Sequence, residues 1–278
     1  MLRLALLLTL SLLSAKGNEE VSPPRDESYQ LIWADEFEGE GAVDETKWTF
    51  ERGFERNHEA QWYQKENAFL KDGCLIIEAR REKVPNPFFE EGSRNWKKER
   101  KEANYTSASL TTAGKFKWTF GRLEVRARFA ALPGLWPAIW TTGEGRWPHG
   151  GEIDVLEFYR GRLYANFCWA GPGGRDVWNT GSHSIERFNL TSWKDRFHLW
   201  VLEWDEEKMT LWMDGELMNT QLTTTVQNLD GSPVNPFLAP QNLRLNLAIG
   251  GQQGGDPSKT SFPQRYEVDY VRVYQKTK

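Results

Sequence analysis

The sequence is poor in cysteine and histidine, and this scarcity argues against several kinds of chemistry. Among 278 residues there are two cysteines and four histidines. Two cysteines cannot build a disulfide framework, so Cys74 and Cys168 either pair in an oxidising compartment or remain buried thiols. The histidines are scattered, without H-E-x-x-H or paired-cysteine spacing, which disfavours a zinc hydrolase. The sequence also lacks a glycine-rich loop that opens a helix and cradles a phosphate.

The chain has no concentrated excess of one charge. Its formal net charge is −4. A nucleic-acid partner or an anionic membrane surface would require a basic face. The densest basic cluster, residues 97–101, is interleaved with glutamate and is typical of a solvated loop. We therefore expect no nucleic-acid partner, and we expect a monomer.

Long apolar runs are absent except at the N-terminus, where residues 1–17 are MLRLALLLTLSLLSAKG. Arg3 precedes an apolar run from Leu4 to Leu13, and small residues follow. The run is too short to span a bilayer and fits a cleavable signal peptide. We therefore predict a secreted or periplasmic protein without membrane contact once the signal is removed.

The remaining chain is predicted to form one domain. Residues 18–30 are interpreted as a leader and residues 31–278 as the domain, a length that single β-sandwiches reach. The 14 tryptophans and 15 phenylalanines exceed what a core of this size needs, which often marks a carbohydrate cleft; simple filling of the core is the alternative. Two sequons, Asn104-Tyr105-Thr106 and Asn189-Leu190-Thr191, matter only in a eukaryotic host.

The hydrophobic periodicity is that of strands. One clear alternation places Leu123, Val125, Ala127 and Phe129 on a buried face and Arg122, Glu124, Arg126 and Arg128 on a wet one. Further strands are predicted at 197–204, 209–213, 243–249 and 266–274. Short strands separated by glycine, proline and aspartate turns predict an all-β sandwich or barrel. Residues 81–104 are charged and aperiodic, which predicts a long surface loop.

The stretch 151–157, GEIDVLE, holds three acidic residues among apolar ones. Acidic residues are depleted from strands, so Glu152, Asp154 and Glu157 require an explanation. Strict alternation places Glu152 and Asp154 on one face and Glu157 on the other. A β-bulge at Val155-Leu156 would return Glu157 to the face of its partners. The alternative is an ordinary strand with a wet acidic face.

Three carboxyl groups on one face suit glycoside hydrolysis. Retaining glycosidases need two carboxyls roughly 5–5.5 Å apart, one as nucleophile and one as general acid and base. A third between them can hydrogen-bond the nucleophile and help to separate the pKa values. Since like charges this close cannot all ionise, one carboxyl stays protonated near neutral pH, as a general acid must.

Taken with its neighbours, this stretch resembles glycoside hydrolase family 16, and in particular its laminarinase-like members, which are endo-1,3-β-glucanases. The resemblance covers nearly all of the chain after the leader. Its other motifs are WADEF (33–37), NHEAQWY (57–63), DGCL (72–75), GRLEVRA (121–127), GLWPAIW (134–140), LNLAIGG (245–251) and EVDYVRVY (267–274). The bulged, six-residue form of the acidic motif is the laminarinase-like one.

The resemblance implies a fold, a mechanism and a metal. The fold is a β-jelly-roll sandwich of two antiparallel sheets, concanavalin A-like, with a cleft on the concave sheet. Glu152 would be the nucleophile, Asp154 the assisting acid and Glu157 the acid/base. Catalysis would need no cofactor. A structural calcium on the convex side is implied, with ligands matching Glu36, the carbonyl of Gly73 and Asp269.

The same resemblance implies the residues that touch sugar. These candidates are Asn57, Glu59, Trp136, Trp140, Trp147 and His149. Alternation equally allows Trp140 to face the core, and a turn role is open to His149. Asn57 and Glu59 have an alternative as loop-to-strand hydrogen bonders.

Several positions depart from the family pattern. Phe167-Cys168-Trp169-Ala170 stands where laminarinases carry a His-Tyr-Gly-like stretch. Gln252-Gln253 replaces an Asn-Trp pair, His58 replaces a second asparagine, and Ala108-Ser109 replaces Gly-Arg. These changes leave the carboxylates untouched but weaken the inference to β-1,3-glucan.

Three functions are weighed. The expected one is a secreted retaining endo-β-glycosidase that cuts β-1,3-glucan of the laminarin type. The second is an endo-β-galactosidase acting on poly-N-acetyllactosamine, mucin-type O-glycans or algal galactans, because glucose and galactose differ by the inversion of one hydroxyl. The third is a carbohydrate-binding protein without turnover, which the presence of all three carboxylates disfavours.

Overall fold

The computed structural model describes residues 27–188, 195–231 and 233–277. The predicted signal peptide, most of the leader and the sequon at 189–191 lie outside these ranges. Within them, no helix is long and apolar enough to cross a membrane. The first strand, β1 (Tyr29–Asp35), begins two residues before the predicted domain boundary.

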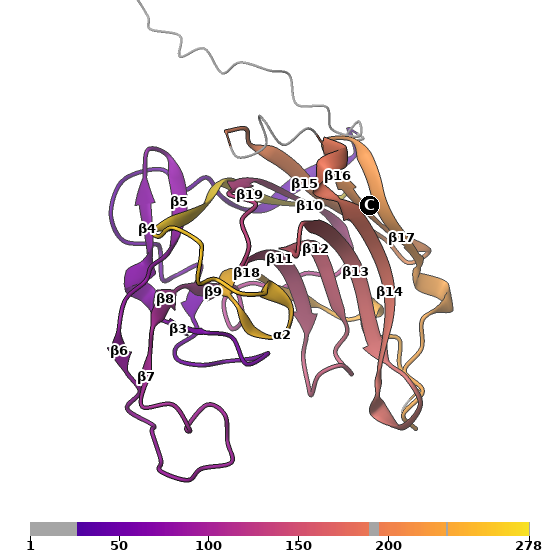
Figure 1. The fold of residues 1–278 in the computed structure, drawn as a ribbon. Coiled ribbons are helices and arrows are strands. Elements are labelled where there is room, and N and C mark those ends of the chain that lie inside the picture. The colour runs from indigo at the N-terminus through magenta and orange to yellow at the C-terminus, as the bar shows by residue number, and fades with distance from the viewer. Residues whose placement is uncertain (1–26, 189–194, 232, 278) are drawn as a thin grey trace, which may run out of the picture.

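The described chain folds into two large antiparallel sheets (Figure 1). The outer sheet has the order β17 (Glu216–Leu222), β16 (Lys208–Met213), β15 (His198–Trp204), β10 (Gly121–Phe129), β19 (Gln264–Lys276), β5 (Cys74–Ala79) and β4 (Ala68–Lys71), and β1 also pairs with β19. The inner sheet has the order β14 (Asp176–Ser184), β13 (Arg162–Ala170), β12 (Glu152–Tyr159), β11 (Leu135–Gly143), β18 (Gln241–Ile249), β9 (Ser109–Thr111) and β2 (Thr49–Phe50). The all-β sandwich predicted from the periodicity is confirmed.

Smaller elements decorate the sandwich. Strand β3 (Gln61–Tyr63) pairs in parallel with β8 (Tyr105–Ser107), and β6 (Val84–Pro85) pairs with β7 (Glu102–Ala103). The helical segments are short: η1 (Lys65–Asn67), η2 (Pro172–Gly174), η3 (Ile185–Phe188), η4 (Thr223–Thr225), η5 (Pro236–Leu238) and α2 (Gly251–Gly254).

One core lies between the two sheets and joins them. Leu123 and Val125 of the outer sheet and Ile139 and Ile153 of the inner sheet are fully buried in the same apolar cluster. Because alternate residues of a strand point to opposite faces, burial of this set commits the other face of the inner sheet to the exterior. The catalytic candidates lie on that second face.

The predicted wet face of β10 is wrong at two positions. Arg122 is completely buried and Glu124 is 7% exposed. The Arg122 guanidinium donates from Nε to Glu124 Oε1 and from Nη1 to Glu203 Oε1, each at 2.7 Å. Alternation therefore predicted correctly that Arg122 and Glu124 lie on the same face of β10. It did not predict that this face is buried at these positions, which is possible because Arg122 pairs with two carboxylates.

The long loop predicted at 81–104 is present, with β6 and β7 near its ends. It packs against residues 54–59. The Arg100 guanidinium lies 3.6 Å from the ring centroid of Phe54 and donates from Nη2 to the carbonyl of Glu59 at 2.9 Å. The Trp96 ring packs against His58 at 4.7 Å between centroids. The loop thus fixes the segment that carries Asn57 and Glu59.

Arg122 should contribute strongly to stability. Its replacement by alanine leaves Glu124 and Glu203 without their cation, and removing one partner of a buried pair costs about 3 kcal/mol or more. Arg128, which pairs with Glu267 at 2.7 Å but is one-third exposed, provides the matched control. We expect Arg128→Ala to cost about 1 kcal/mol or less. Denaturant unfolding measures both, and equal losses would contradict the buried role of Arg122.

Candidate active site

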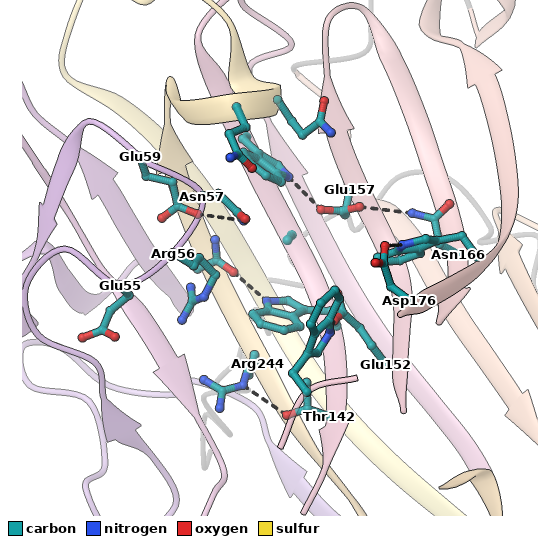
Figure 2. Close-up of a pocket in the computed structure, with 18 of the residues that line it drawn as sticks. Glu55, Arg56, Asn57, Glu59, Thr142, Glu152, Glu157, Asn166, Asp176 and Arg244 are labelled. Atoms are coloured by element: carbon teal, nitrogen blue, oxygen red, sulfur yellow. Dashed lines mark hydrogen bonds between the residues drawn. The ribbon is translucent and has the colours of Figure 1, made fainter. Parts of the chain in front are cut away.

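The three acidic residues of β12 lie on one face because the strand contains the predicted bulge. Against β13, Asp154 pairs with Asn166 and Glu157 with Tyr164, so Val155 and Leu156 together oppose one residue. The register against β11 shifts at the same place. Both bulge residues point into the core, at 1% and 0% exposure. The prediction that a bulge unites the carboxylates is confirmed, and Figure 2 shows Glu152 and Glu157 facing one pocket.

Hydrogen bonds hold the three carboxyls in place. Asp154, 1% exposed, bridges Glu152 and Glu157 through its own side chain. Asn166 Nδ2 donates to Asp154 Oδ2 at 2.9 Å and to Glu157 Oε2 at 3.1 Å. Trp136 Nε1 donates to Glu157 Oε1 at 2.8 Å, and Trp147 Nε1 donates to Glu152 Oε2. Each catalytic candidate therefore has a fixed orientation.

Burial and mutual repulsion make these carboxyls reluctant to ionise. Burial, reinforced by the charge of Glu152, raises the pKa of Glu157 to about 7. Burial and the charge of Asp154 raise the pKa of Glu152 well above its usual range, and burial with the charge of Glu157 does the same for Asp154. Since the three carboxyls interact, they titrate as a unit that retains protons near neutral pH.

A cleft of about 790 Å³ runs over these carboxyls, a volume typical of ligand sites. Its wall on the β18 side is charged. Arg56 and Arg244 both pair with Glu51, and Arg244 Nη1 lies 2.6 Å from Glu51 Oε1. Although burial opposes ionisation, these two cations lower the pKa of Glu51 to about 2. Both guanidiniums lie 5.2 Å from the ring centroid of Trp140.

The predicted sugar-contact residues on this wall line the cleft. Trp140 faces it rather than the core, with Nε1 donating to Asn246 Oδ1 at 2.7 Å. Asn57 and Glu59 also line it, and Asn57 Nδ2 donates to Glu59 Oε1 at 3.4 Å. Glu59 is 1% exposed, and burial raises its pKa. Its hydrogen bond from Gln61 Nε2 at 2.7 Å agrees with the alternative of a loop-to-strand bonder.

Asn57 owes its position to a strained turn. Asn57 and His58 both have positive φ, at 55° and 52°, which is unusual for residues with side chains. Gln252 N donates to the carbonyl of Asn57 at 2.9 Å. A Cβ on Gly251 would lie 2.8 Å from that carbonyl oxygen, so this close contact requires glycine. Gln252 and Gln253 of α2 also line the cleft.

The opposite wall, on the β14 side, is aromatic. Trp147 precedes β12, and Trp178 lies on β14 across from Cys168. Their ring centroids are 6.4 Å apart. Trp178 Nε1 donates to Asp176 Oδ2 at 2.6 Å (Figure 2). Cys168 is buried beside Glu152, and both cysteines are free thiols.

His149 is not among the described residues that line the cleft, and its role as a sugar contact stays a prediction. Its Nε2 pairs with Asp230, and its carbonyl accepts a hydrogen bond from Asn228 Nδ2 at 2.9 Å. The ring therefore faces the 228–230 loop. This anchors the turn that carries Trp147, in agreement with the turn role that its position also allowed.

The residues expected to bind calcium do not fit a cation as arranged. Arg272 donates to both oxygens of Glu36 at 2.8 Å, and Arg126 Nη1 donates to Asp269 Oδ2 at 2.7 Å. Gly73 occupies a turn with φ of 72°. Among the described residues, no group of three or more His, Cys, Asp or Glu side chains could hold a metal ion. The two carboxylates serve as partners of arginines.

Several cleft residues escaped sequence reasoning. They are Glu51, Arg56, Asn166, Asp176, Trp178 and Arg244. Asn166 and Trp178 were accessible in principle, because alternation along β13 and β14 places them on the face of Asp154 once the strand pairing is known. Arg56 and Arg244 are 188 residues apart in the sequence, and only the fold brings them to one carboxylate.

Comparison with known proteins identifies the family of this fold and cleft. Residues 54–272 match glycosyl hydrolases family 16. The chain belongs to this family. A β-glucanase of Rhodothermus marinus is 35% identical over 265 residues, which cover 89% of this chain and 85% of that protein. The family assignment makes the protein a glycoside hydrolase with a jelly-roll fold.

Two solved structures illustrate the range of this similarity. One is 37% identical with a TM-score of 0.82, and the match covers 92% of this chain and 94% of that chain. It is described with endo-acting O-glycanases that members of the human gut microbiota express to initiate mucin breakdown. The laminarinase catalytic domain from Thermotoga maritima MSB8 is 34% identical with a TM-score of 0.73, covering 91% and 100%.

The face of β12 on which Glu157 lies should determine the activity of this family 16 hydrolase. Deleting Val155 removes the extra residue and leaves the three carboxyls two residues apart, still on one face. Deleting Val155 and Leu156 together turns Glu157 to the core. We expect measurable hydrolysis from the first variant and none from the second, with circular dichroism confirming that both fold. An active double deletion would contradict the need for all three carboxyls on one face.

The pKa of Glu157 should limit activity at alkaline pH. As pH rises through about 7, Glu157, the predicted general acid, loses its proton, so kcat/KM should fall. Trp136 stabilises the ionised form of Glu157 through its N–H. Trp136→Phe should therefore raise that pKa and move the alkaline limb to higher pH. Trp118→Phe, buried outside the described cleft lining, is the control. An unmoved or lowered limb in Trp136→Phe would contradict the assignment.

Proposed function

We propose that the protein is a secreted retaining endo-β-glycosidase that cuts internal β-1,3-linkages of laminarin-type glucan by double displacement. The observation that carries this proposal is the bulged strand, which places Glu152 and Glu157 in the lining of one cleft and the buried Asp154 on the same face between them. Membership of glycosyl hydrolases family 16 supports retention, in which one of the two glutamates acts as the nucleophile. Residues 1–17 support export.

In the first step, ionised Glu152 attacks the anomeric carbon while the bond to the leaving oxygen breaks. Glu157 gives its proton to that oxygen, and a glycosyl ester of Glu152 forms. A proton on Asp154 supports this step, because it removes the charge that opposes ionisation of Glu152 and allows a hydrogen bond to the Glu152 carboxylate.

In the second step, Glu157 is ionised and acts as a base. It takes a proton from a water molecule whose oxygen attacks the anomeric carbon. The ester bond breaks, and Glu152 leaves as a carboxylate. Two inversions give net retention, and Glu157 ends protonated, ready for another cycle. The raised pKa of about 7 suits a group that must serve as both acid and base.

Similarity to β-glucanase and laminarinase relatives supports glucan as the substrate. A second candidate is a galactose-containing glycan, such as poly-N-acetyllactosamine, a mucin-type O-glycan or an algal galactan. The TM-score of 0.82 to the structure described with O-glycanases favours it. The side chains beside the carboxyls also favour it: Cys168 lies next to Glu152, and Gln252 lines the rim where laminarinases carry other groups.

A digestion panel tests the substrate. Laminarin, mixed-linkage glucan, poly-N-acetyllactosamine, mucin O-glycans and agar-type galactan are incubated with the protein, and the products are identified by mass spectrometry. We expect oligosaccharides from laminarin, released from within the chain. Cleavage of a galactose-containing polymer alone would overturn the glucan proposal and establish the second candidate.

Two variants test the mechanism. Glu152→Gln should abolish turnover because no nucleophile remains. Glu157→Gln should slow hydrolysis of the natural polymer by about 10²-fold to 10⁴-fold, the usual contribution of a general acid, while an aryl glycoside with a good leaving group is still consumed in the first step. Unchanged turnover in Glu152→Gln would refute the catalytic assignment.

A further inference from the structure

Two tryptophans on the β14 side of the cleft expose unusually large ring surfaces. Trp147 is 48% exposed and Trp178 is 40% exposed. Neither belongs to the described core clusters of the sandwich. Trp178 lies on β14, which is the edge strand of the inner sheet. Apolar side chains on an exposed edge favour aggregation, so a tryptophan there is not explained by folding alone.

Both rings are held in fixed orientations by their own N–H groups. Trp147 Nε1 donates to Glu152, and Trp178 Nε1 donates to Asp176 Oδ2 at 2.6 Å. The polar edge of each indole is therefore engaged inside the protein, and the surface that remains is the apolar ring. The ring planes are inclined by 45° with centroids 6.4 Å apart, so they border an angled space rather than stacking flat on each other.

The strand register places this aromatic pair next to the reaction centre. Glu152 pairs with Cys168 on β13, and Cys168 pairs with Trp178 on β14. Adjacent strands lie roughly 4.8 Å apart, so the Trp178 backbone is about 10 Å from that of Glu152. Cys168 between them is completely buried, so it presents no surface to the cleft, whereas Glu152 and Trp178 both line it. A sugar ring bound next to the cleaved bond would meet the exposed ring of Trp178 on this side of the cleft.

We propose that Trp178, together with Trp147 and Asp176, forms the sugar-binding subsite on the β14 side of the cleavage point. This inference rests on the proposed glycosidase function and identifies residues that select its substrate. The ligand is a neutral pyranose ring, whose C–H face packs against the indole. Asp176 uses one oxygen for Trp178, and the acceptor sites left on its carboxylate are available to sugar hydroxyls.

The chemistry of this wall distinguishes a neutral ring from a charged one. Asp176 and Glu152 are the polar groups that hold the two indoles, and both are acids. The arginines that line the cleft, Arg56 and Arg244, belong to the β18 side. A sulfated or carboxylated sugar would face carboxylates on the β14 side, so an uncharged sugar is preferred there.

Binding without turnover tests the subsite independently of catalysis. Glu152→Gln and the double variant Glu152→Gln/Trp178→Ala are titrated by calorimetry with laminarin, poly-N-acetyllactosamine and galactan oligosaccharides. We expect at least one series to bind the first variant and to bind the double variant about 10-fold to 100-fold more weakly, as for truncation of a tryptophan that anchors a ligand. Glu152→Gln/Trp178→Phe should recover most of the affinity, because phenylalanine keeps an aromatic face.

Cleavage patterns supply a second readout. On end-labelled oligosaccharides of defined length, Trp178→Ala should lower kcat/KM and move the preferred cleavage site along the chain, because one binding position is lost. Trp212→Ala is the matched control, since Trp212 is a partly exposed tryptophan on the outer sheet outside the described cleft lining. It should leave both the pattern and kcat/KM unchanged.

The outcomes separate the subsite from the proposed function. Equal affinity and an unchanged pattern in the Trp178→Ala variants would overturn the subsite while the glycosidase function stands. Weaker binding in Glu152→Gln/Trp178→Ala, combined with no cleavage of any polymer by the unmodified protein, would overturn the function while the subsite stands. Binding of no oligosaccharide to Glu152→Gln would overturn the subsite directly.

Discussion

Mutual repulsion among three carboxyls, one buried and two at the surface of the cleft, is the constraint around which this cleft is organised. Glu152, Asp154 and Glu157 lie within six residues, and burial raises the pKa of each. Such a cluster is tolerable only with shared protons and well-placed donors. Asn166 and Trp136 supply two of those donors. These two residues therefore both stabilise the cluster and orient Asp154 and Glu157.

The bulge reconciles this cluster with the core. A regular strand would have to choose between burying Val155 and Leu156 and presenting all three acids to the cleft, because alternate residues face opposite ways. With the bulge, both apolar residues are buried and the acids remain together. Core packing therefore stabilises the reactive geometry, since straightening the strand would expose an apolar side chain or bury Glu157 without its partners.

Sequence reasoning succeeded where local periodicity decides the outcome. The strands, the hairpin of β15 and β16, and the bulge follow from alternation and turn chemistry, because these signals depend on neighbouring residues. It failed where exposure depends on distant partners. Arg122 is buried because its guanidinium pairs with Glu203, which lies 81 positions away in the sequence. The contact of Arg56 and Arg244 with Glu51 could not be predicted either. It depends on the order of the strands in the inner sheet, which local sequence patterns do not specify.

The two walls of the cleft differ in chemistry, and this asymmetry bears on specificity. On the β18 side, guanidiniums surround Trp140, and a glycine-dependent contact with α2 fixes the strained turn of Asn57. On the β14 side, exposed indoles dominate. Directional donors discriminate the configuration of individual hydroxyls, whereas aromatic faces accept any ring with a suitable C–H surface. The β18 wall is therefore where glucose and galactose should be distinguished, and the β14 wall is where the neighbouring unit is held.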